Sequence, residues 1–291
     1  MKTWGKLSFY PLLVLAVAFI FYACQKEVSS GSNNVNSGKT KLSVFLTDGP
    51  YDFQKVLVDI QQIEVKIDTC RRQEDDDHNG PGCDDDQDSL SNRCEIWDTL
   101  DIRPGIYDLI TLRNGVDTLL ASGFLLNGKI ERIKITLGNN NSVMADSIVY
   151  PLHLINNQHF VYVNIHREHL DSISSNNFRL FLDFDLSRSI KFIGGEYWLK
   201  PVLKPFGRHS SGAIEGKIRP VHSFGTIKAY NATDTAYARP EDEGEFKIRG
   251  LREGTYSLFI DGINGYQDST ITNITVTRGR ENNIGRIQLH Q

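Results

Sequence analysis

The chain has 291 residues, of which 32 are Lys or Arg and 36 are Asp or Glu, so its formal net charge is −4 at pH 7. No basic cluster is longer than Arg71-Arg72, which argues against nucleic-acid binding, because that mode of binding requires many cations against phosphates. Short alternating runs of Val, Ile, Leu and Phe, separated by Asn-Gly, Gly-Gly and Asp-Gly turns, predict an all-β protein of two domains.

The N-terminus has the features of a lipoprotein signal peptide over residues 1–23. Lys2 and Lys6 precede an apolar run that ends immediately before Cys24. We therefore expect cleavage before Cys24 and acylation of this residue, and two or more acyl chains would anchor the protein stably in a membrane. An uncleaved membrane-spanning anchor and secretory cleavage without lipid are the alternatives. Phe21 stands where lipoprotein signals usually carry an aliphatic residue.

The residues from Cys24 onward predict a tether and an outer-membrane location. Residues 24–39 are mostly Ser, Gly and Asn, so they cannot bury enough apolar surface to offset the entropy of ordering. Gln25-Lys26-Glu27 resembles a short form of the acidic, Lys-containing surface-export signal of Bacteroidetes-type bacteria. This resemblance implies an outer-membrane lipoprotein that faces either the cell surface or the periplasm.

Residues 40–206 predict a first β-sandwich domain. Apolar side chains alternate along six runs, and each run places one face toward a core. The phase of the alternation changes at Gln61-Gln62, as a β-bulge would cause. The face opposite the last run carries Arg179, Asp183 and Asp185 and is predicted to be more polar, although Phe181 lies on it. The alternating sets are Leu42, Val44 and Leu46; Val56, Val58 and Ile60; Ile63, Val65 and Ile67; Ile133, Ile135 and Leu137; Val161, Val163 and Ile165; and Phe178, Leu180, Leu182, Phe184 and Leu186.

Three cysteines follow Cys24, and an exported location permits one disulfide among them. Cys70 ends one strand-like run and Cys94 begins the next, so the two would face each other at the neck of a hairpin. We favour the pair Cys70–Cys94, and Cys70–Cys83 is the alternative. A zinc site is disfavoured, because no ligand pair has the Cys-x-x-Cys spacing.

The insertion at residues 71–93 is acidic, and part of it has the spacing of a calcium loop. Asp75, Asp77 and Asn79 precede a glycine at D-x-D-x-N-G spacing, and Asp86 occupies position twelve. Position twelve is normally Glu, and no helices are expected on either side, so this is not an EF-hand. Two interpretations stay open: a calcium-ordered surface loop, or a solvated acidic hairpin tip.

Several His and Asp residues of the first domain are of types that can act in catalysis or bind a metal. His166 and His169 have i, i+3 spacing at a strand end, whereas zinc proteases place two His at i, i+4 on a helix. Asp183 and Asp185 could act as an acid–base pair, although cross-strand or turn contacts are the simpler expectation. Asp48 is expected to cap the turn before Pro50. Since G-x-S-x-G, H-E-x-x-H and phosphate-loop motifs are missing, we predict no catalytic residue.

Seven segments of this domain follow one another in a recognisable order. They are Leu46-Thr47-Asp48-Gly49-Pro50, Val56 to Lys66, Trp97, Tyr107-Asp108-Leu109, Asn114-Gly115, Phe184-Asp185-Leu186-Ser187-Arg188-Ser189 and Leu199-Lys200-Pro201-Val202. Together they resemble the family called domain of unknown function 4382, which is found in secreted bacterial lipoproteins. The family has no established activity, so the resemblance implies a β-rich fold and an envelope location, and no chemistry. The insertion at 71–93 is longer and more acidic than the family pattern.

Residues 213–289 predict a second β-sandwich after a polar link. Gly244 to Leu258 contains G-x-F-x-I-x-G-L-x-x-G-x-Y, in which Phe246 and Ile248 alternate inward and two glycines form a turn. This pattern resembles the carboxypeptidase regulatory-like domain, a small transthyretin-like β-sandwich. The resemblance implies a non-catalytic module that acts as a spacer, a docking unit or a sugar-contacting surface. Lys217 is expected to face solvent, which disfavours an isopeptide bond.

The tripeptide Asp-Ser/Thr followed by Ala, Ile, Leu, Val, Met or Thr recurs more often than the roughly one occurrence that composition predicts. It resembles the O-glycosylation acceptor of Bacteroidetes-type exported proteins. The alternative is that Asp-Ser and Asp-Thr simply suit β-turns. The candidate acceptors are Ser89, Thr99, Thr118, Ser147, Ser172, Thr235 and Ser269.

These observations favour a non-enzymatic, envelope-anchored lipoprotein that acts as a binding, adhesion or scaffold module. The expected partners are the membrane, through the lipid on Cys24, and a glycan or protein ligand at the cell surface. A carbohydrate-binding accessory protein of a glycan-uptake system is the second hypothesis, and a hydrolase is the third. An exposed platform of Trp97, Trp198 or Tyr side chains would favour glycans, whereas a cleft joining Asp183, Asp185 and His166 would favour an enzyme.

Overall fold

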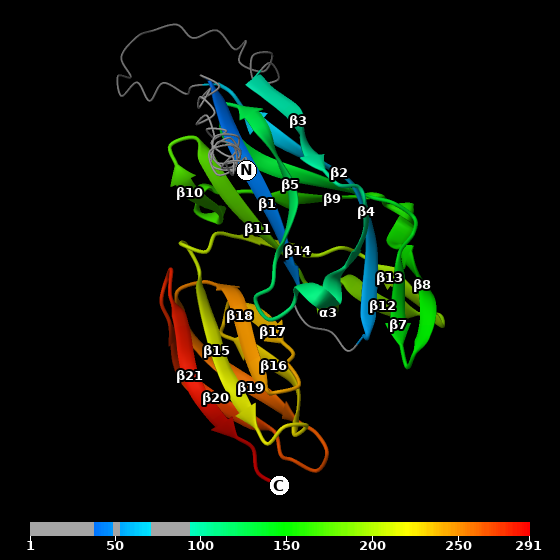
Figure 1. Ribbon diagram of the computed structural model, residues 1–291, viewed down its shortest axis with the longest axis vertical. Helices are drawn as coiled ribbons and strands as arrows, with labels where there is room; N and C mark the ends of the chain where they lie inside the picture. The colour runs from blue at the N-terminus through cyan, green and yellow to red at the C-terminus, as the bar shows by residue number, and fades with distance from the viewer. Residues whose placement is uncertain (1–37, 49–52, 71–93) are drawn as a thin grey trace, which may run out of the picture. The chain divides into compact units, whose positions relative to one another are not determined.

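The computed structural model describes residues 38–48, 53–70 and 94–291. Almost every element in these ranges is a β-strand, and the predicted all-β class with sandwich-like sheets is confirmed (Figure 1). No helix among the described residues has the length and apolar character needed to span a bilayer. The predictions for the signal peptide, for Cys24 and for the calcium-type ligands Asp75, Asp77, Asn79 and Asp86 lie outside the described residues.

Fourteen strands and four short helical segments make up the described part of the chain up to residue 206. The strands are β1 Lys39–Asp48, β2 Lys55–Asp68, β3 Glu95–Ile102, β4 Gly105–Asp108, β5 Thr118–Leu126, β6 Lys129–Leu137, β7 Ser142–Ala145, β8 Ile148–Leu154, β9 Phe160–Asn164, β10 Leu170–Ser174, β11 Asn177–Phe184, β12 Ile190–Ile193, β13 Glu196–Leu199 and β14 Leu203–Phe206. The helical segments are η1 Leu109–Leu112, η2 Ile155–Asn157, η3 Arg167–His169 and α3 Leu186–Ser189. The strands are hydrogen-bonded in the order β10-β11-β1-β5-β3-β2-β7-β8-β13-β12, with β14 beside β11, β4 and β6 beside β2, and β9 beside β6.

The period-two pattern of the sequence accounts for the core of this region. β1 and β11 are parallel neighbours, and their register places Val44 beside Leu180 and Leu46 beside Leu182. All four side chains are fully buried. Because successive residues of a strand point to opposite faces, these pairs form one continuous apolar layer.

Strand β2 shows the predicted change of phase. Its register against β6 shifts between Ile60 and Gln62, which is the position of a β-bulge. Val56, Val58 and Ile60 before the bulge and Ile63, Val65 and Ile67 after it are all at most 1% exposed. The bulge therefore keeps both halves of the strand facing the same core.

On the face of β11 that carries Arg179 and Asp183, the apolar residue Phe181 is buried. Phe181 is 2% exposed, and its ring stacks on Phe45 and Phe206 at centroid distances of 5.1 and 5.5 Å. The guanidinium carbon of Arg208 lies 4.5 Å from the centroid of the same ring. The side chains of Phe206 on the paired strand β14 and of Arg208 thus pack on Phe181 on the face of β11 that points away from the main core.

A disulfide joins the end of β2 to the start of β3. Cys70 and Cys94 form a disulfide with a Cα–Cα distance of 5.2 Å, just beyond the paired residues of the two strands. The backbone N–H of Thr69 also donates to the carbonyl of Cys94 at 2.9 Å. The alternative partner Cys83 lies outside the described residues.

The C-terminal region has its own hydrophobic core between two sheets. Its strands are β15 Gly212–Arg219, β16 Phe224–Tyr230, β17 Thr235–Ala238, β18 Glu245–Leu251, β19 Gly254–Gly262, β20 Ser269–Val276 and β21 Glu281–Gln288. One sheet has the order β18-β15-β21 and the other β17-β16-β19-β20. Phe246, Ile248, Tyr256 and Leu258 point into the core between them, as the alternation predicts. Gly250 and Gly254 have φ values of +68° and +151°, which favour glycine at these two positions beside the turn.

Replacement of Phe181 by Ala tests the packing on the face of β11 that points away from the main core. We expect Phe181→Ala to lower the free energy of unfolding by about 3 to 5 kcal/mol, because it removes a fully buried ring and leaves a cavity. Phe124→Ala is the control, since Phe124 is 53% exposed on β5. Urea unfolding followed by intrinsic fluorescence would measure both changes. Equal effects of the two substitutions would contradict the described packing.

Candidate binding surface

One outward face of the first region carries exposed aromatic rings. It is formed by the neighbouring strands β3, β2, β6 and β9, whose opposite face packs on the core. Trp97 of β3 and Tyr162 and Phe160 of β9 occupy outward positions and are 44%, 47% and 40% exposed. We call these three residues the aromatic strip. Exposed aromatic side chains that form a contiguous group on a rigid sheet are typical of a binding surface.

The rings of the aromatic strip lie close to one another although their strands are not adjacent. The centroids of Trp97 and Tyr162 are 6.0 Å apart, and those of Tyr162 and Phe160 are 5.4 Å apart. Trp97 is paired in register with Lys66 of β2, and Tyr162 with Lys134 of β6. The two large side chains therefore approach each other over the strands that separate them.

Charged side chains between and beside the rings are held in pairs. Lys66 Nζ lies 2.6 Å from Glu95 Oε2, and Lys134 Nζ lies 2.8 Å from Glu64 Oε2. The hydrogen bond with Glu64 raises the pKa of Lys134. Opposite charges that face each other across strands stabilise the sheet, and here they also fix the positions of these side chains.

Two cations also contact the rings. The Arg132 guanidinium lies 5.6 Å from the Tyr162 centroid and donates from Nε to Asn164 Oδ1 at 2.9 Å. Lys134 Nζ lies 5.9 Å from the Phe160 centroid. Both distances are within the range of cation–π attraction. The result is a pre-ordered group of tilted rings bordered by hydrogen-bond donors and acceptors.

The sequence identified only part of this surface. Trp97 lies on it, whereas Trp198 is half-buried on β13, with its ring 5.3 Å from that of His153. Phe160, Tyr162 and Arg132 were not singled out. A usable signal was present, because the alternation of Val161, Val163 and Ile165 places the intervening aromatic residues on the outward face.

The carboxylates considered for catalysis, Asp183 and Asp185, lie at the end of β11 and directly after it. Asp185 accepts hydrogen bonds from the backbone N–H of Arg188 and from Ser187 Oγ at 3.0 and 2.6 Å, so it caps helix α3. The expectation of a turn contact is thus met for Asp185. The backbone N–H of His166 donates to His169 Nδ1 at 3.1 Å, and no interaction among the described residues joins His166 to either carboxylate.

The turn that Asp48 is expected to cap lies at residues 49–52, outside the described residues, so this expectation stays a prediction. The carboxylate of Asp48 is 6% exposed, and within the described ranges neither oxygen has a hydrogen-bond partner. Asp48 continues the phase of Leu42, Val44 and Leu46, so its side chain points to the buried side of β1. Burial raises the pKa of Asp48 well above its usual value, and the charges of Asp183 and Asp185 act in the same direction.

Asp183 lies on β11, where it is paired in register with Lys204 of β14. Burial, followed by the charge of Asp185, raises the pKa of Asp183 to about 7, whereas Lys204 lowers it. Both perturbed carboxyls thus favour the protonated form near the end of the same pair of strands. Among residues 38–48, 53–70 and 94–291, no group of three or more His, Cys, Asp or Glu is arranged to hold a metal ion.

A pH series would test the environment of Asp183. Between the usual pKa of about 4 and the folded pKa of about 7, the folded state binds more protons than the unfolded state. The free energy of unfolding should therefore fall as the pH rises through this window and become level above it. Asp183→Asn should make this fall shallower in urea unfolding at pH 4, 5.5, 7 and 8. Asp101→Asn, an exposed substitution on β3, should leave it unchanged, and an unaltered slope in Asp183→Asn would refute the shift.

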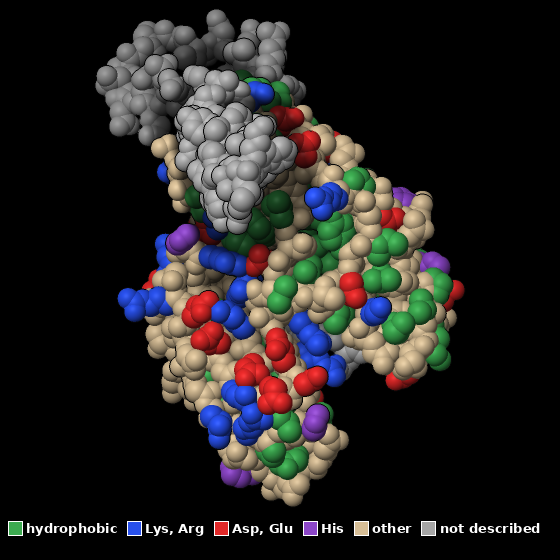
Figure 2. All heavy atoms as spheres, in the orientation of Figure 1, with side chains coloured by type: hydrophobic (Ala, Val, Ile, Leu, Met, Phe, Trp, Pro, Cys, Tyr) green, Lys and Arg blue, Asp and Glu red, His purple; other side chains and the backbone are tan. Residues whose placement is uncertain are grey.

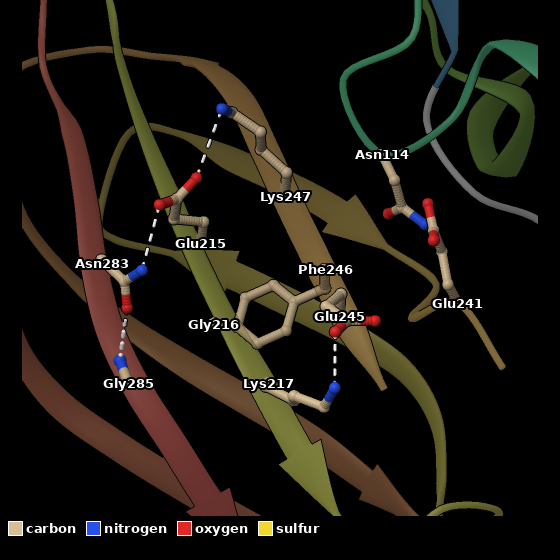
Figure 3. Close-up of a pocket in the computed structure, with 10 residues that line it drawn as sticks. All are labelled: Asn114, Glu215, Gly216, Lys217, Glu241, Glu245, Phe246, Lys247, Asn283 and Gly285. Carbon is tan, nitrogen blue, oxygen red and sulfur yellow. Dashed lines mark hydrogen bonds and ion pairs between the residues drawn. The ribbon is translucent and has the colours of Figure 1, made fainter. Parts of the chain in front are cut away.

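A depression of about 450 Å³ lies on the outer face of β18, β15 and β21 (Figure 3). Its charged residues form a cross-strand ladder, with Lys217 2.5 Å from Glu245 and Lys247 3.3 Å from Glu215. The hydrogen bond from Lys217 lowers the pKa of Glu245. The ring of Phe246 lies over Gly216, where a Cβ atom would be 3.0 Å from it. Figure 2 shows interspersed red and blue side chains in the region of β15 and β18, as expected for a sheet stabilised by paired charges.

The candidate O-glycosylation acceptors differ in accessibility. Thr99, Ser147, Ser172 and Thr235 are exposed, Thr118 and Ser269 are half-buried, and Ser89 lies outside the described residues. Some of the preceding aspartates have structural partners. Asp171 accepts hydrogen bonds from the backbone N–H groups of Arg208 and His209 at 2.8 and 2.9 Å, and Asp234 accepts one from Lys204 at 2.7 Å. Such contacts agree with the alternative that these tripeptides also serve local structure.

The model of one protein family, Domain of unknown function (DUF4382), matches residues 39–201. The chain belongs to the DUF4382 family. The DUF4382 region includes all the strands that form the aromatic strip and its core. No curated protein sequence matches the chain.

Several solved structures have weak structural similarity to this DUF4382 protein. The minor pilin GBS52 of Streptococcus agalactiae is 10% identical, with a TM-score of 0.22 over 85% of this chain and 94% of the pilin. A single-residue mutant of the shaft pilin SpaA of Lactobacillus rhamnosus GG is 9% identical, with a TM-score of 0.24 over 87% and 96%. A cohesin–X-dockerin complex of Acetivibrio cellulolyticus is 22% identical, with a TM-score of 0.23 over 27% of this chain and 56% of that chain. The match thus spans about half the length of the cohesin–X-dockerin chain, and these low scores carry no functional argument.

Proposed function

We propose that this DUF4382 protein is a non-enzymatic, envelope-anchored module for binding, adhesion or scaffolding, and that the aromatic strip is its ligand surface. The carrying observation is the exposure of Trp97, Tyr162 and Phe160 on a sheet whose other face is fully packed. A rigid, outward-facing group of rings favours binding over chemistry, because it supplies contact area without an acid, base or nucleophile. The hydrolase hypothesis is less well supported, since His166 contacts His169 and not Asp183 or Asp185.

The second region fits the same proposal as a spacer or docking unit. Its resemblance to the carboxypeptidase regulatory-like domain rests on the motif around Phe246, Gly250 and Tyr256. The pairing of charges on its outer sheet supports a stabilising role for that face. A module of this kind would act as a spacer between the DUF4382 region and whatever the module itself docks on.

A specific observation favours the second hypothesis, a carbohydrate-binding accessory role in glycan uptake. The ring-bearing surface that we expected of such a protein includes Trp97 and the exposed Tyr162, with hydrogen-bonding side chains at its border. Loss of uptake of one polysaccharide, with normal uptake of monosaccharides, in cells that lack this protein would support this role. Unchanged growth on all polysaccharides tested would contradict it.

Substitution of Cys24 tests the proposed anchor. We expect Cys24→Ser to abolish lipidation and to move the protein from the membrane fraction to the soluble fraction or the medium, because the acyl chains supply the attachment. A Ser30→Ala variant in the expected tether is the matched control and should stay in the membrane fraction. If the Cys24→Ser protein remains in the membrane at its original mass, the lipid-anchor proposal fails. Protease treatment of intact cells would then distinguish the cell surface from the periplasm.

The proposed O-glycosylation predicts a measurable mass. Protein isolated from its native envelope should be heavier than lipid plus polypeptide by the mass of whole glycans. Thr99→Ala and Ser147→Ala, at exposed candidate acceptors, should each remove one glycan in intact-mass spectrometry. Val116→Ala provides a control at an exposed position outside the tripeptides. A mass equal to bare polypeptide plus lipid would reject glycosylation.

A further inference from the structure

We propose that the aromatic strip binds a neutral polysaccharide built of pyranose units, with the sugar rings lying on the faces of Trp97, Tyr162 and Phe160. This inference rests on the proposed function of the same surface and names its ligand. A pyranose ring presents C–H groups on its face and hydroxyl groups around its edge. The C–H groups suit the electron-rich faces of aromatic rings, and the hydroxyl groups suit polar side chains at the border.

The geometry of the strip fits an extended ligand. Successive ring centroids lie 6.0 and 5.4 Å apart with interplanar angles of 49° and 61°, so the three rings form a continuous row in which each face is tilted relative to the next. Each ring is between 40% and 47% exposed, which leaves part of its surface available for contact. A row of three aromatic rings favours a chain of sugars over a single sugar, because one sugar unit would leave part of the row uncovered.

The charges around the strip favour a neutral ligand. Lys66 and Lys134 pair with three carboxylates, Glu64, Glu95 and Glu131, and Glu131 also pairs with Lys129, so that of the cations around the strip Arg132 alone has no carboxylate partner among the described residues. Lys66 lies 2.6 Å from Glu95 and 3.9 Å from Glu131, and Lys134 lies 2.8 Å from Glu64. A polyanion such as a nucleic acid or a sulfated glycan needs a surplus of positive charge, which these pairs do not supply.

The same side chains argue against a protein partner. Lys and Glu are depleted in the centres of protein–protein interfaces, because charges there lose hydration without sufficient compensation. Here Lys66 and Lys134 belong to β2 and β6, the strands between Trp97 and Tyr162. Hydroxyl groups of a sugar both donate and accept, so they can bond to either member of each pair.

Arg132 supplies the most accessible donors beside the rings. Its Nε donates to Asn164, and in the described residues it makes no ion pair with a carboxylate. The guanidinium has five N–H donors, so four are left beyond this bond for sugar hydroxyl groups. Because packing on Tyr162 already restrains the side chain, binding would cost less ordering entropy than with a mobile arginine.

Affinity electrophoresis of the full chain, purified in mild detergent from a host that leaves it unglycosylated, would test this inference. The gels would contain a neutral β-glucan, xylan, galactomannan or α-glucan, with heparin and hyaluronan as polyanions. We expect at least one neutral polymer to retard the protein and the polyanions not to. Trp97→Ala and Tyr162→Ala should each weaken retardation at least tenfold, whereas Phe124→Ala, at an exposed ring on β5, should change it less than twofold.

Further variants and measurements separate the competing occupants. Thr235, another exposed candidate acceptor, lies on β17 and not on the strands of the aromatic strip, so Thr235→Ala in the same unmodified protein should bind like the parent. Light scattering should show that the parent protein is a monomer. A parent dimer that becomes a monomer in Trp97→Ala would identify a second copy of the chain as the occupant of the strip. Thermal unfolding of each variant verifies that the fold is intact.

The inference is overturned if no neutral polymer retards the protein, if only polyanions do, or if a folded Trp97→Ala protein binds like the parent. Membrane fractionation of the same protein keeps this result apart from the anchor. An anchored protein that binds no neutral polymer overturns the ligand alone. A glycan-binding protein that is not membrane-attached overturns the anchor alone.

Discussion

The alternation of side chains along β2, between a buried face and an exposed face, is the constraint on which the rest of the DUF4382 region depends. This strand pairs with β3, β4, β6 and β7. Its inward residues Ile63, Val65 and Ile67 are fully buried, while Glu64 and Lys66 between them border the aromatic strip. A slip of one residue would exchange the two sets, so the free energy that buries the core also fixes the polar side of the binding surface.

The bulge in β2 keeps the alternation of buried and exposed side chains in phase along the whole strand. Strand β2 has 14 residues, whereas β6 has 9 and pairs with β2 only from Ile60 to Asp68. The extra residue between Ile60 and Gln62 resets the phase, so that β4 and β7 pair with the first half and β3 with the second. The candidate binding surface lies entirely on the second half, where β2 pairs with both β3 and β6.

The sequence predicts the strands better than their neighbours in space. Alternation is a local property, so the buried faces of β1, β2, β6 and β11 could be predicted from the residues alone. The aromatic strip depends on β9 pairing with β6 and β6 with β2, and these contacts join segments that are far apart in the chain. Trp97 was therefore recognisable as a candidate, but nothing in the sequence specified that Tyr162 would lie beside it.

Asp48 is a different case, in which a local pattern predicts the burial of a polar side chain. The alternation of Leu42, Val44 and Leu46 extends to Asp48 and predicts a buried carboxyl, whereas the following Gly-Pro predicts a turn that a carboxylate would cap. Asp48 is 6% exposed, as the alternation predicts, and the turn lies outside the described residues. The free energy of pairing β1 with β5 and β11 over the whole strand exceeds the cost of burying one carboxyl, which protonation reduces.

Two surfaces of the protein carry Lys–Glu pairs across strands, and the difference between them indicates where binding occurs. On β15 and β18 the pairs form a ladder above Phe246, whose ring is buried and packs against Gly216. On β2, β3 and β6 similar pairs border rings that remain more than one-third exposed. Charge pairs alone are explained by sheet stability, so they do not distinguish a binding surface. Exposed rings have no such explanation, because burying their apolar area would lower the free energy of the folded chain, and their exposure therefore favours a ligand that covers them.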